Sequence, residues 1–385
     1  MSFRLQAALA SAFVLLSASV TTSAVAQEAI APEEIGVETT IKPGPNIYVL
    51  MSAWDGAGAV NVLSADDLSY KGNVTTGMTG QFALGSKADV VFTASAFPKR
   101  IVYGPVEAVF QKSDISTLKT QQEIIVPPKL AQAAAAQGMI QVSADGRRAL
   151  LQNATPATSV TVLDLEKGTV VDEVPIPGCF SIILSADAKR FTSICGDGTL
   201  LTVKLGDDGK AVSQVSSDKI FDVDADPLFI HTQRVNGDLV FLSYRGVFYR
   251  VSDKADKAKL LDRYAFTEGV AGDWAPGGYE VIAYNEPNGV MFVTMHSGAE
   301  DGSHKNGSEE IWAVDPIKKK LMYRSVAKGL THIAVNQSKT MPLVFGIDSH
   351  DGKILRYEVD PTARFAAKLT HEIELAEPGF VVAAP

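Results

Sequence analysis

The stretch SVTVLDLEKGTVVDEVPIPG, Ser159 to Gly178, has apolar residues at alternate positions on both sides of a polar corner. A period of two is typical of a β-strand with one buried face, and the corner joins two such strands into a hairpin. The pattern occurs seven times, at Ala57 to Val74, Val106 to Pro128, Ser159 to Gly178, Leu200 to Ser217, Val247 to Phe266, Glu310 to Gly329 and Lys353 to Leu375.

A second element precedes each hairpin, in which a turn of Pro, Ser, Asp or Gly leads into an apolar strand. The seven copies begin at Pro43, Ser86, Ser143, Ser185, Val235, Pro287 and Ser338. A repeat of roughly 40 to 55 residues with several antiparallel strands is typical of a propeller blade, which buries its faces only against neighbouring blades. We therefore predict an all-β fold, a single seven-bladed β-propeller over residues 43–385. A β-sandwich or a long meander is the alternative, but evenly repeated units favour the propeller.

The N-terminus has the pattern of an export signal. Arg4 precedes an apolar run from Leu5 to Val20, and Ala24-Val25-Ala26 matches an A-x-A cleavage site. We predict a signal peptide over residues 1–26, cleaved after Ala26, and a periplasmic protein; an uncleaved anchor is the alternative. No other stretch is long enough to cross a bilayer, so we predict no membrane insertion.

The acidic residues 27–42 precede the first blade, and we predict an N-terminal arm there, either extended or frayed. The whole chain has a formal charge of −9, and removal of the signal peptide, with one Arg and no acid, makes it −10. Such a charge argues against nucleic acid as a partner. In an exported protein, the two cysteines Cys179 and Cys195 favour a disulfide over thiols, and we expect it to join neighbouring blades.

Motifs of enzymatic chemistry are absent from the sequence. The six histidines lack metal-site spacing, and neither a GxSxG elbow nor a phosphate-binding loop occurs. Asp222, Asp224 and Asp226 alternate as in a calcium loop but lack its Gly and closing Glu, so we predict a solvated turn and no metal site. Two loops contain aromatic, His, Pro and Gly residues that a simple blade turn does not require, and we call them the rich loops. They are Asp273 to Tyr279 and Met295 to Trp312. Such loops either cap a blade or contact a ligand or partner.

Several segments resemble the heavy chain of the quinoprotein amine dehydrogenases. They are Pro156-Ala157-Thr158-Ser159, Gly178-Cys179-Phe180-Ser181, Ile194-Cys195-Gly196-Asp197-Gly198, Trp274-Ala275-Pro276-Gly277-Gly278-Tyr279, Met295-His296 and Gly302-Ser303-His304-Lys305. Two others, Leu151 to Ala154 and Leu205 to Lys210, make the chain more similar to the aromatic amine (aralkylamine) enzyme than to methylamine dehydrogenase. The methylamine enzyme's heavy chain remains the alternative.

The resemblance implies a division of labour between two chains. In this family the heavy chain is a seven-bladed propeller, and a small cysteine-rich light chain carries tryptophan tryptophylquinone. Two heavy and two light chains form a periplasmic heterotetramer that oxidises primary amines to aldehyde and ammonia. Electrons then pass to a blue copper protein, azurin or amicyanin. We therefore expect no cofactor and no catalytic residue on this chain.

The resemblance also points to two residues of the substrate channel. The family places a Phe at the channel mouth after the first blade strand, where this sequence has Trp54; a second channel position falls at Thr79. Both differ from the residues expected in the aromatic amine enzymes, and Trp54 as simple packing between blades is the alternative. Two other functions remain open, a propeller that binds a protein or glycan without chemistry, and a propeller hydrolase such as a lactonase.

Overall fold

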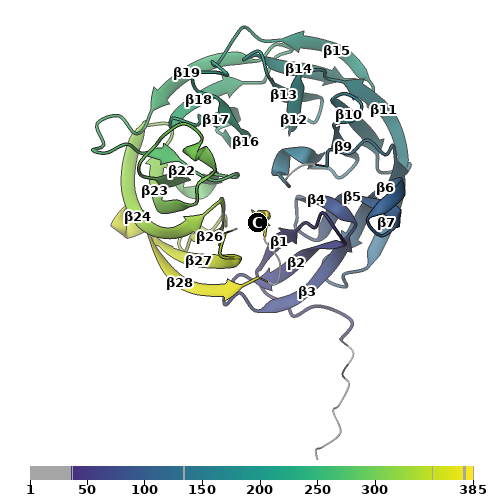
Figure 1. Cartoon of the computed structure of the whole chain (residues 1–385), viewed down its shortest axis with the longest axis horizontal. Coiled ribbons are helices and arrows are strands. Elements are labelled where there is room, and N and C mark those ends of the chain that lie inside the picture. Colours follow the sequence, from purple (N-terminus) through teal and green to yellow (C-terminus); the bar gives the residue numbers. More distant parts are fainter. Residues whose placement is uncertain (1–35, 37, 133–134, 349, 376–378, 385) are drawn as a thin grey trace, which may run out of the picture. The chain divides into compact units, whose positions relative to one another are not determined.

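The computed structural model describes residues 36, 38–132, 135–348, 350–375 and 379–384. From Thr39 onward the chain forms one compact unit, in which seven small antiparallel sheets are arranged in a ring (Figure 1). This confirms the predicted all-β, seven-bladed propeller. The predicted signal peptide lies outside the described residues. Within those ranges, no helix combines the length and the apolar character that a membrane span requires.

The blades are numbered here in chain order, and their strands are given from the central channel outward. Blade 1 comprises β29 (Val381–Ala383), β1 (Asn46–Met51), β2 (Gly58–Ser64) and β3 (Tyr70–Thr76). Blade 2 comprises β4 (Met78–Leu84), β5 (Val90–Arg100), β6 (Tyr103–Asp114) and β7 (Thr120–Val126). Blade 3 comprises β8 (Ile140–Val142), β9 (Arg148–Asn153), β10 (Ser159–Asp164) and β11 (Thr169–Pro175), and the 3-10 turn η1 (Gln137–Met139) precedes it.

Blade 4 comprises β12 (Cys179–Leu184), β13 (Arg190–Cys195), β14 (Leu200–Leu205) and β15 (Ala211–Ser216). Blade 5 comprises β16 (Leu228–Val235), β17 (Asp238–Ser243), β18 (Val247–Ser252) and β19 (Lys259–Ala265). Blade 6 comprises β20 (Ala275–Pro276), β21 (Ile282–Asn285), β22 (Val290–His296), β23 (Ser308–Asp315) and β24 (Lys320–Leu330), with η2 (Glu286–Asn288) and η3 (Ser303–Lys305) in its loops. Blade 7 comprises β25 (His332–Val335), β26 (Leu343–Asp348), β27 (Lys353–Asp360) and β28 (Ala366–Glu374), with η4 (Pro361–Ala363).

The predicted repeats correspond to the second, third and fourth strands of each blade. The hairpin predicted at Ser159 to Gly178, for example, is β10 and β11, paired from Ser159↔Pro175 to Asp164↔Thr169. The strand predicted after Ser143 is β9. The innermost strands were not predicted because they lack regular alternation, and some are also short, as in β8 with only three residues.

A Ser-x-Asp turn precedes several second strands, and its hydrogen bonds explain the repeated sequence. In blade 4 the Ser185 hydroxyl donates to Asp187 at 2.7 Å and accepts the backbone N–H of Arg190 at 3.0 Å. Blade 3 repeats the arrangement at Ser143 and Asp145. The serine hydroxyl lowers the pKa of both aspartates, so each turn holds a charged carboxylate at neutral pH.

The hydrophobic core lies between blades. Among the described residues, seven large clusters each combine apolar side chains from two neighbouring blades. One cluster, for instance, contains Phe248 of blade 5 and the fully buried Trp312 of blade 6, and the Phe266 ring contacts both. Each sheet thus buries both faces, which a single blade cannot do.

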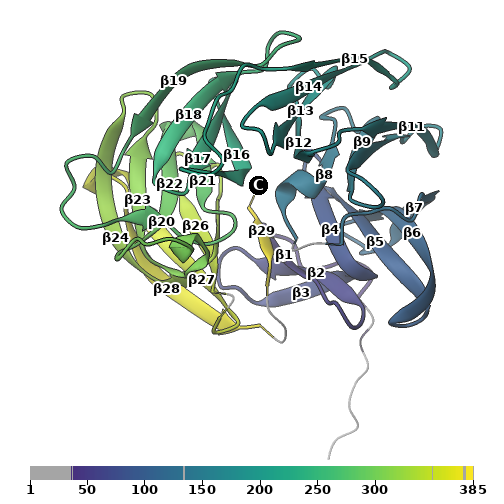
Figure 2. The same cartoon turned by 45° about the horizontal axis from the view of Figure 1, so that its top comes forward.

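The C-terminal strand closes the ring. β29 pairs antiparallel with β1, with Val382 opposite Val49, and lies on the channel side of blade 1 (Figure 2). Val382 is fully buried in the cluster between blades 7 and 1, beside Phe345 and Ile347. The last and first segments of the propeller are therefore joined by a ladder and by a shared core.

The end of the predicted N-terminal arm contacts the propeller. The backbone N–H of Ile41 donates to the Ser116 carbonyl at 2.8 Å, and its side chain packs near Leu118 in the cluster between blades 1 and 2. Residues 27–35 and 37 lie outside the described residues.

The two cysteines form the predicted disulfide, Cys179–Cys195. The prediction that it joins neighbouring blades is wrong, because Cys179 begins β12 and lies opposite Cys195 of β13 in the same sheet. The repeat pattern did not show β12, and Cys179 was therefore assigned to the preceding hairpin. The bridge fastens the innermost strand of blade 4 to its neighbour.

Replacing both Cys179 and Cys195 with Ser is expected to lower the free energy of unfolding by about 3 kcal/mol, the value for closing a loop of this length. Urea unfolding of the two proteins gives the difference. Wild-type protein unfolded in reductant should show the same loss, because both cysteines are buried and are reduced only on unfolding. Equal midpoints for all three samples would mean that the bridge contributes no stability.

Candidate functional site

One end of the ring carries most of the residues singled out from the sequence. Because neighbouring strands are antiparallel, the loops from second to third strands and the crossovers between blades share this end. We call it the Trp54 rim, since the β1–β2 loop carries Trp54. Both rich loops lie here: Asp273 to Tyr279 belongs to the crossover into blade 6, and the second loop joins β22 to β23.

The two predicted channel residues are close together on this rim. The backbone N–H of Thr79 donates to the carbonyl of Ala53, next to Trp54, at 2.9 Å. The Trp54 side chain is 55% exposed, whereas Thr79 is 5% exposed and its hydroxyl donates to the Met78 carbonyl. The indole is thus available to a ligand or partner, and Thr79 holds its loop in place. Their role in a substrate channel stays a prediction.

An open cleft of about 840 Å³ lies at the same rim between blades 5 and 6. Tyr244 and His304 line it and stack with their ring centroids 3.9 Å apart. Burial lowers the pKa of His304, so the imidazole is neutral at pH 7. With Trp274 and the carboxylates of Asp224 and Glu300 in its lining, the cleft suits contact with an apolar or cationic group.

Trp274, which lines this cleft, belongs to a stack of charged and aromatic side chains. The Arg324 guanidinium lies 4.2 Å from the ring centroid of Trp274 and 4.8 Å from that of Trp312. Glu310 accepts two hydrogen bonds from Arg324, at 2.7 and 2.9 Å, and one from the Trp312 indole at 2.6 Å. These contacts fix both indoles. The Arg324–Glu310 ion pair therefore positions the rim at Trp274 and stabilises blade 6.

The central channel holds a buried acid that the sequence analysis missed. Glu280 lies between β20 and β21. Just before it, Gly278 has a φ of +123° and passes so close to Thr331 that a Cβ on Gly278 would contact the Thr331 carbonyl oxygen. The Glu280 carboxylate accepts the backbone N–H of Gln137 at 2.7 Å and the Gln137 side-chain amide at 3.2 Å. Burial raises the pKa of Glu280 to about 8, although these hydrogen bonds oppose the shift. An acid just before the apolar run Val281-Ile282-Ala283 was the available signal.

Two buried histidines line the same channel region. Burial lowers the pKa of His231 to about 4 and that of His332 to about 3, so both are neutral at pH 7. Gln233 contacts His231 Nε2 at 3.0 Å, and the Thr331 hydroxyl contacts His332 Nδ1 at 3.0 Å. In the part of the chain that the structure describes, no three His, Cys, Asp or Glu side chains form a group that could hold a metal ion.

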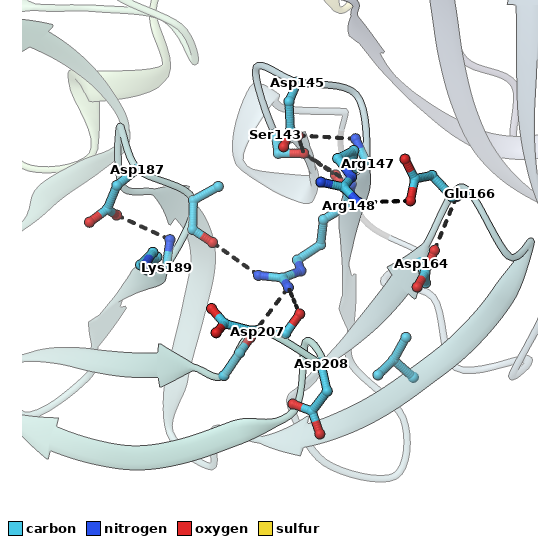
Figure 3. Close-up of a pocket in the computed structure, with 13 residues that line it drawn as sticks. Ser143, Asp145, Arg147, Arg148, Asp164, Glu166, Asp187, Lys189, Asp207 and Asp208 are labelled. Atoms are coloured by element: carbon cyan, nitrogen blue, oxygen red, sulfur yellow. Dashed lines mark hydrogen bonds and ion pairs between the residues drawn. The ribbon is translucent and has the colours of Figure 1, made fainter.

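The opposite rim has a pocket of about 470 Å³ between blades 3 and 4, lined by turn residues (Figure 3). Arg148 of β9 reaches across it and donates to the carbonyls of Ala188, Gly206 and Asp207 in blade 4. Its guanidinium is therefore used to join two blades. The acidic lining belongs largely to the Ser-x-Asp and hairpin turns, so this pocket has a structural explanation.

Comparisons with known proteins point to one family. Residues 10–370 match the family described as Methylamine dehydrogenase heavy chain (MADH). The methylamine dehydrogenase heavy chain of Methylobacillus flagellatus is 25% identical over 296 residues, which cover 74% of this chain and 73% of the relative. That of Methylophilus methylotrophus is 23% identical over 370 residues, covering 89% and 90%.

Solved structures share the fold at low identity. A putative 6-phosphogluconolactonase from Bacteroides fragilis superposes with a TM-score of 0.61 at 10% identity, covering 91% of this chain and 99% of that one. Another, from Bacteroides uniformis, gives 0.58 at 11%, covering 90% and 99%. Such likeness shows the propeller fold alone. The family match, in contrast, extends over nearly the whole chain, which therefore belongs to the methylamine dehydrogenase heavy chain family.

Proposed function

We propose that this chain is the non-catalytic heavy subunit of a periplasmic dehydrogenase that oxidises primary amines, aromatic amines above all. Two copies hold two light chains, each with tryptophan tryptophylquinone, and a blue copper protein, azurin or amicyanin, accepts the electrons. The observation that carries the proposal is the heavy-chain family match over residues 10–370. The quinone on the light chain supplies the oxidising power.

The contribution of this chain lies on the Trp54 rim. The exposed Trp54 indole supplies an apolar wall at the mouth of the substrate channel, and the Thr79 backbone hydrogen bond holds the loop that carries it. A wall of this kind excludes water and orients the amine without taking part in proton transfer. The disulfide and the closed ring keep the rim rigid.

A direct test is to produce this chain with the light chain and the proteins that mature its quinone. Dye reduction is then followed with tyramine, phenylethylamine and methylamine. We expect amine-dependent reduction, with the two aromatic amines preferred. Methylamine is the second candidate substrate, since relatives with 23% and 25% identity are methylamine dehydrogenase heavy chains. No reduction by any primary amine, with the quinone correctly formed, would reject the function.

Trp54→Ala is expected to change the ratio of kcat/KM for phenylethylamine to that for methylamine about tenfold. Loss of apolar contact with a few carbon atoms of the larger amine costs about 1 to 3 kcal/mol. Steady-state kinetics of the complex measures this ratio. Tyr70→Ala, which removes an exposed aromatic of blade 1 at the opposite end of the sheet, is the matched control. The same ratio in all three complexes would mean that Trp54 only packs.

A further inference from the structure

Blade 2 has a hairpin that extends beyond its sheet. β5 and β6 contain 11 and 12 residues, whereas the corresponding strands of the other blades contain six to eight. The neighbouring strands stop early, at the pairs Met78↔Ala96 and Ala108↔Val126. Residues 97–107 therefore form a two-stranded extension, the blade 2 ribbon, and within the described ranges no strand pairs with either of its edges.

The ribbon begins beside the predicted substrate channel. A Cβ on Gly77, two residues before Thr79, would lie 3.1 Å from the Phe97 ring and would clash with the carbonyl oxygen of Ala96. The β5–β6 turn also joins a second to a third strand, which places it on the Trp54 rim. The base of the ribbon thus lies beside the segment from Gly77 to Thr79, which is hydrogen-bonded to the Trp54 loop.

The tip of the ribbon is apolar, contrary to the usual chemistry of a turn. Hairpin turns favour Gly, Asn and Asp, yet this turn consists of Ile101 and Val102, and Ile101 has the left-handed φ of 63° that β-branched residues disfavour. Ile101 is 77% and Tyr103 63% exposed, and Phe97 and Val106 are exposed as well. An isolated two-stranded ribbon is marginally stable in water, and a gathered apolar surface marks a contact site.

Two features indicate what the ribbon contacts. Pro98 and Pro105 remove backbone donors from its two strands, which opposes strand addition and favours recognition through side chains. Lys99 and Arg100 outnumber Glu107, so the ribbon is basic on a chain with a net charge of −9. A matching partner therefore has an apolar patch bordered by carboxylates.

We propose that the blade 2 ribbon docks the light chain of the amine dehydrogenase, which covers Ile101 and Tyr103 with such a patch. The proposal rests on the function proposed above. A light chain that presents its quinone to Trp54 reaches the ribbon on the same surface, and burial of the apolar tip stabilises both elements. The ribbon is then a clamp that sets the position of the quinone relative to the channel mouth.

The test measures light-chain binding to heavy-chain variants, with wild-type light chain that carries the mature quinone. Ile101→Asp is expected to raise the Kd at least about thirtyfold, as for a central interface residue. The double variant Lys99→Glu/Arg100→Glu should also bind more weakly, with a smaller deficit at high salt. Val212→Asp is the matched control, because Val212 is 67% exposed on the outer strand β15 of blade 4. Thermal unfolding of each heavy chain alone checks that the propeller is intact.

A second variant keeps the proposal testable if a point variant folds poorly. Asn-Gly in place of residues 98–106 closes the hairpin after the pair Phe97↔Glu107 with a two-residue turn. It should keep the unfolding temperature of the wild type and lose light-chain binding to the same extent as Ile101→Asp.

The outcomes separate the inference from the function on which it rests. Unchanged light-chain affinity in the shortened and Ile101→Asp variants would overturn the ribbon's role, even if the wild-type complex oxidises amines. A wild-type complex that binds through the ribbon but reduces no dye with any amine would reject the function and leave the docking in place. If the variants only dissociate a dimer of heavy chains, the ribbon is a contact between copies of this chain, and the proposal is wrong.

Discussion

Replacing Glu280 with Gln is expected to raise the free energy of unfolding at pH 8 by about 4 kcal/mol. Burial raises the pKa of this carboxyl from 4.5 to about 8 in the folded protein. Between these two values the folded state binds more protons than the unfolded state. The stability that depends on Glu280 is therefore complete below pH 4.5 and is lost as the pH rises toward 8. An amide keeps a hydrogen bond with Gln137 and does not ionise.

The buried histidines give the free energy of unfolding the opposite pH dependence. The pKa values of His231 and His332 are lowered to about 4 and about 3, so the unfolded state binds more protons below the ordinary histidine value of 6.5. Stability is lost as the pH falls from 6.5 toward 4. Together with Glu280, these groups predict a stability maximum at about pH 6.5 in the wild type.

Urea unfolding at intervals between pH 5 and pH 9 measures the free energy of unfolding on both sides of the maximum, the acid limb below pH 6.5 and the alkaline limb above it. Glu280→Gln should steepen the rise in stability below pH 6.5, because Glu280 no longer offsets the histidines there, and should flatten the fall in stability above pH 6.5. Glu268→Gln is the matched control, because Glu268 is exposed and its substitution should leave the profile unchanged. A Glu280→Gln protein with the same slope above pH 6.5 as the wild type would show that this carboxyl does not ionise within the range.

Val382→Asp is expected to destabilise the propeller by about 5 kcal/mol. The substitution removes a fully buried apolar side chain from the seam between blades 7 and 1 and places a carboxylate among Val49, Phe345 and Ile347. It also weakens the ladder by which β29 holds β1. Because this seam joins the first and last segments of the chain, its loss opens the ring itself.

Denaturant unfolding at pH 7, monitored by tryptophan fluorescence, measures the effect. Val382→Ala should cost less, about 2 to 3 kcal/mol, since it removes contacts without burying a charge. Val212→Asp introduces the same charge on an exposed strand and should change stability by less than about 0.5 kcal/mol. If Val382→Asp unfolded with the wild-type midpoint, closure by β29 would not support the ring.

Much of the fold could be predicted from the sequence, because most strands carry their own pattern. Strands such as β10 and β11 have one face against a neighbouring blade and a turn of fixed chemistry, and alternation and turn residues are visible in any such segment. The innermost strands are different. β8 has only three residues and β12 is buried at most of its positions, so their sequences lack a clear period. For this reason the disulfide was predicted, but its place within one blade was not.

The candidate site was predicted in part. The residues Trp54 and Thr79 came from resemblance to a family, and the structure places them on one rim with the rich loops. Glu280 was missed because its position depends on Gln137, 143 residues away in the chain. The exposed ribbon was missed because residues 97–105 show no alternation, with Pro98, Pro105 and the adjacent Lys99 and Arg100 among them, and only the paired register shows that β5 and β6 continue past the neighbouring strands.

The sequence by itself determined the number of blades, the family and the pair of cysteines, because local periodicity, turn residues and motifs are read along the chain. The tertiary structure alone decided ring closure by β29, the burial of Glu280 and the exposure of Ile101. Burial and exposure depend on which distant segments lie beside a residue. Burial removes water from a carboxyl and shifts its pKa, whereas exposure leaves an apolar tip in unfavourable contact with water.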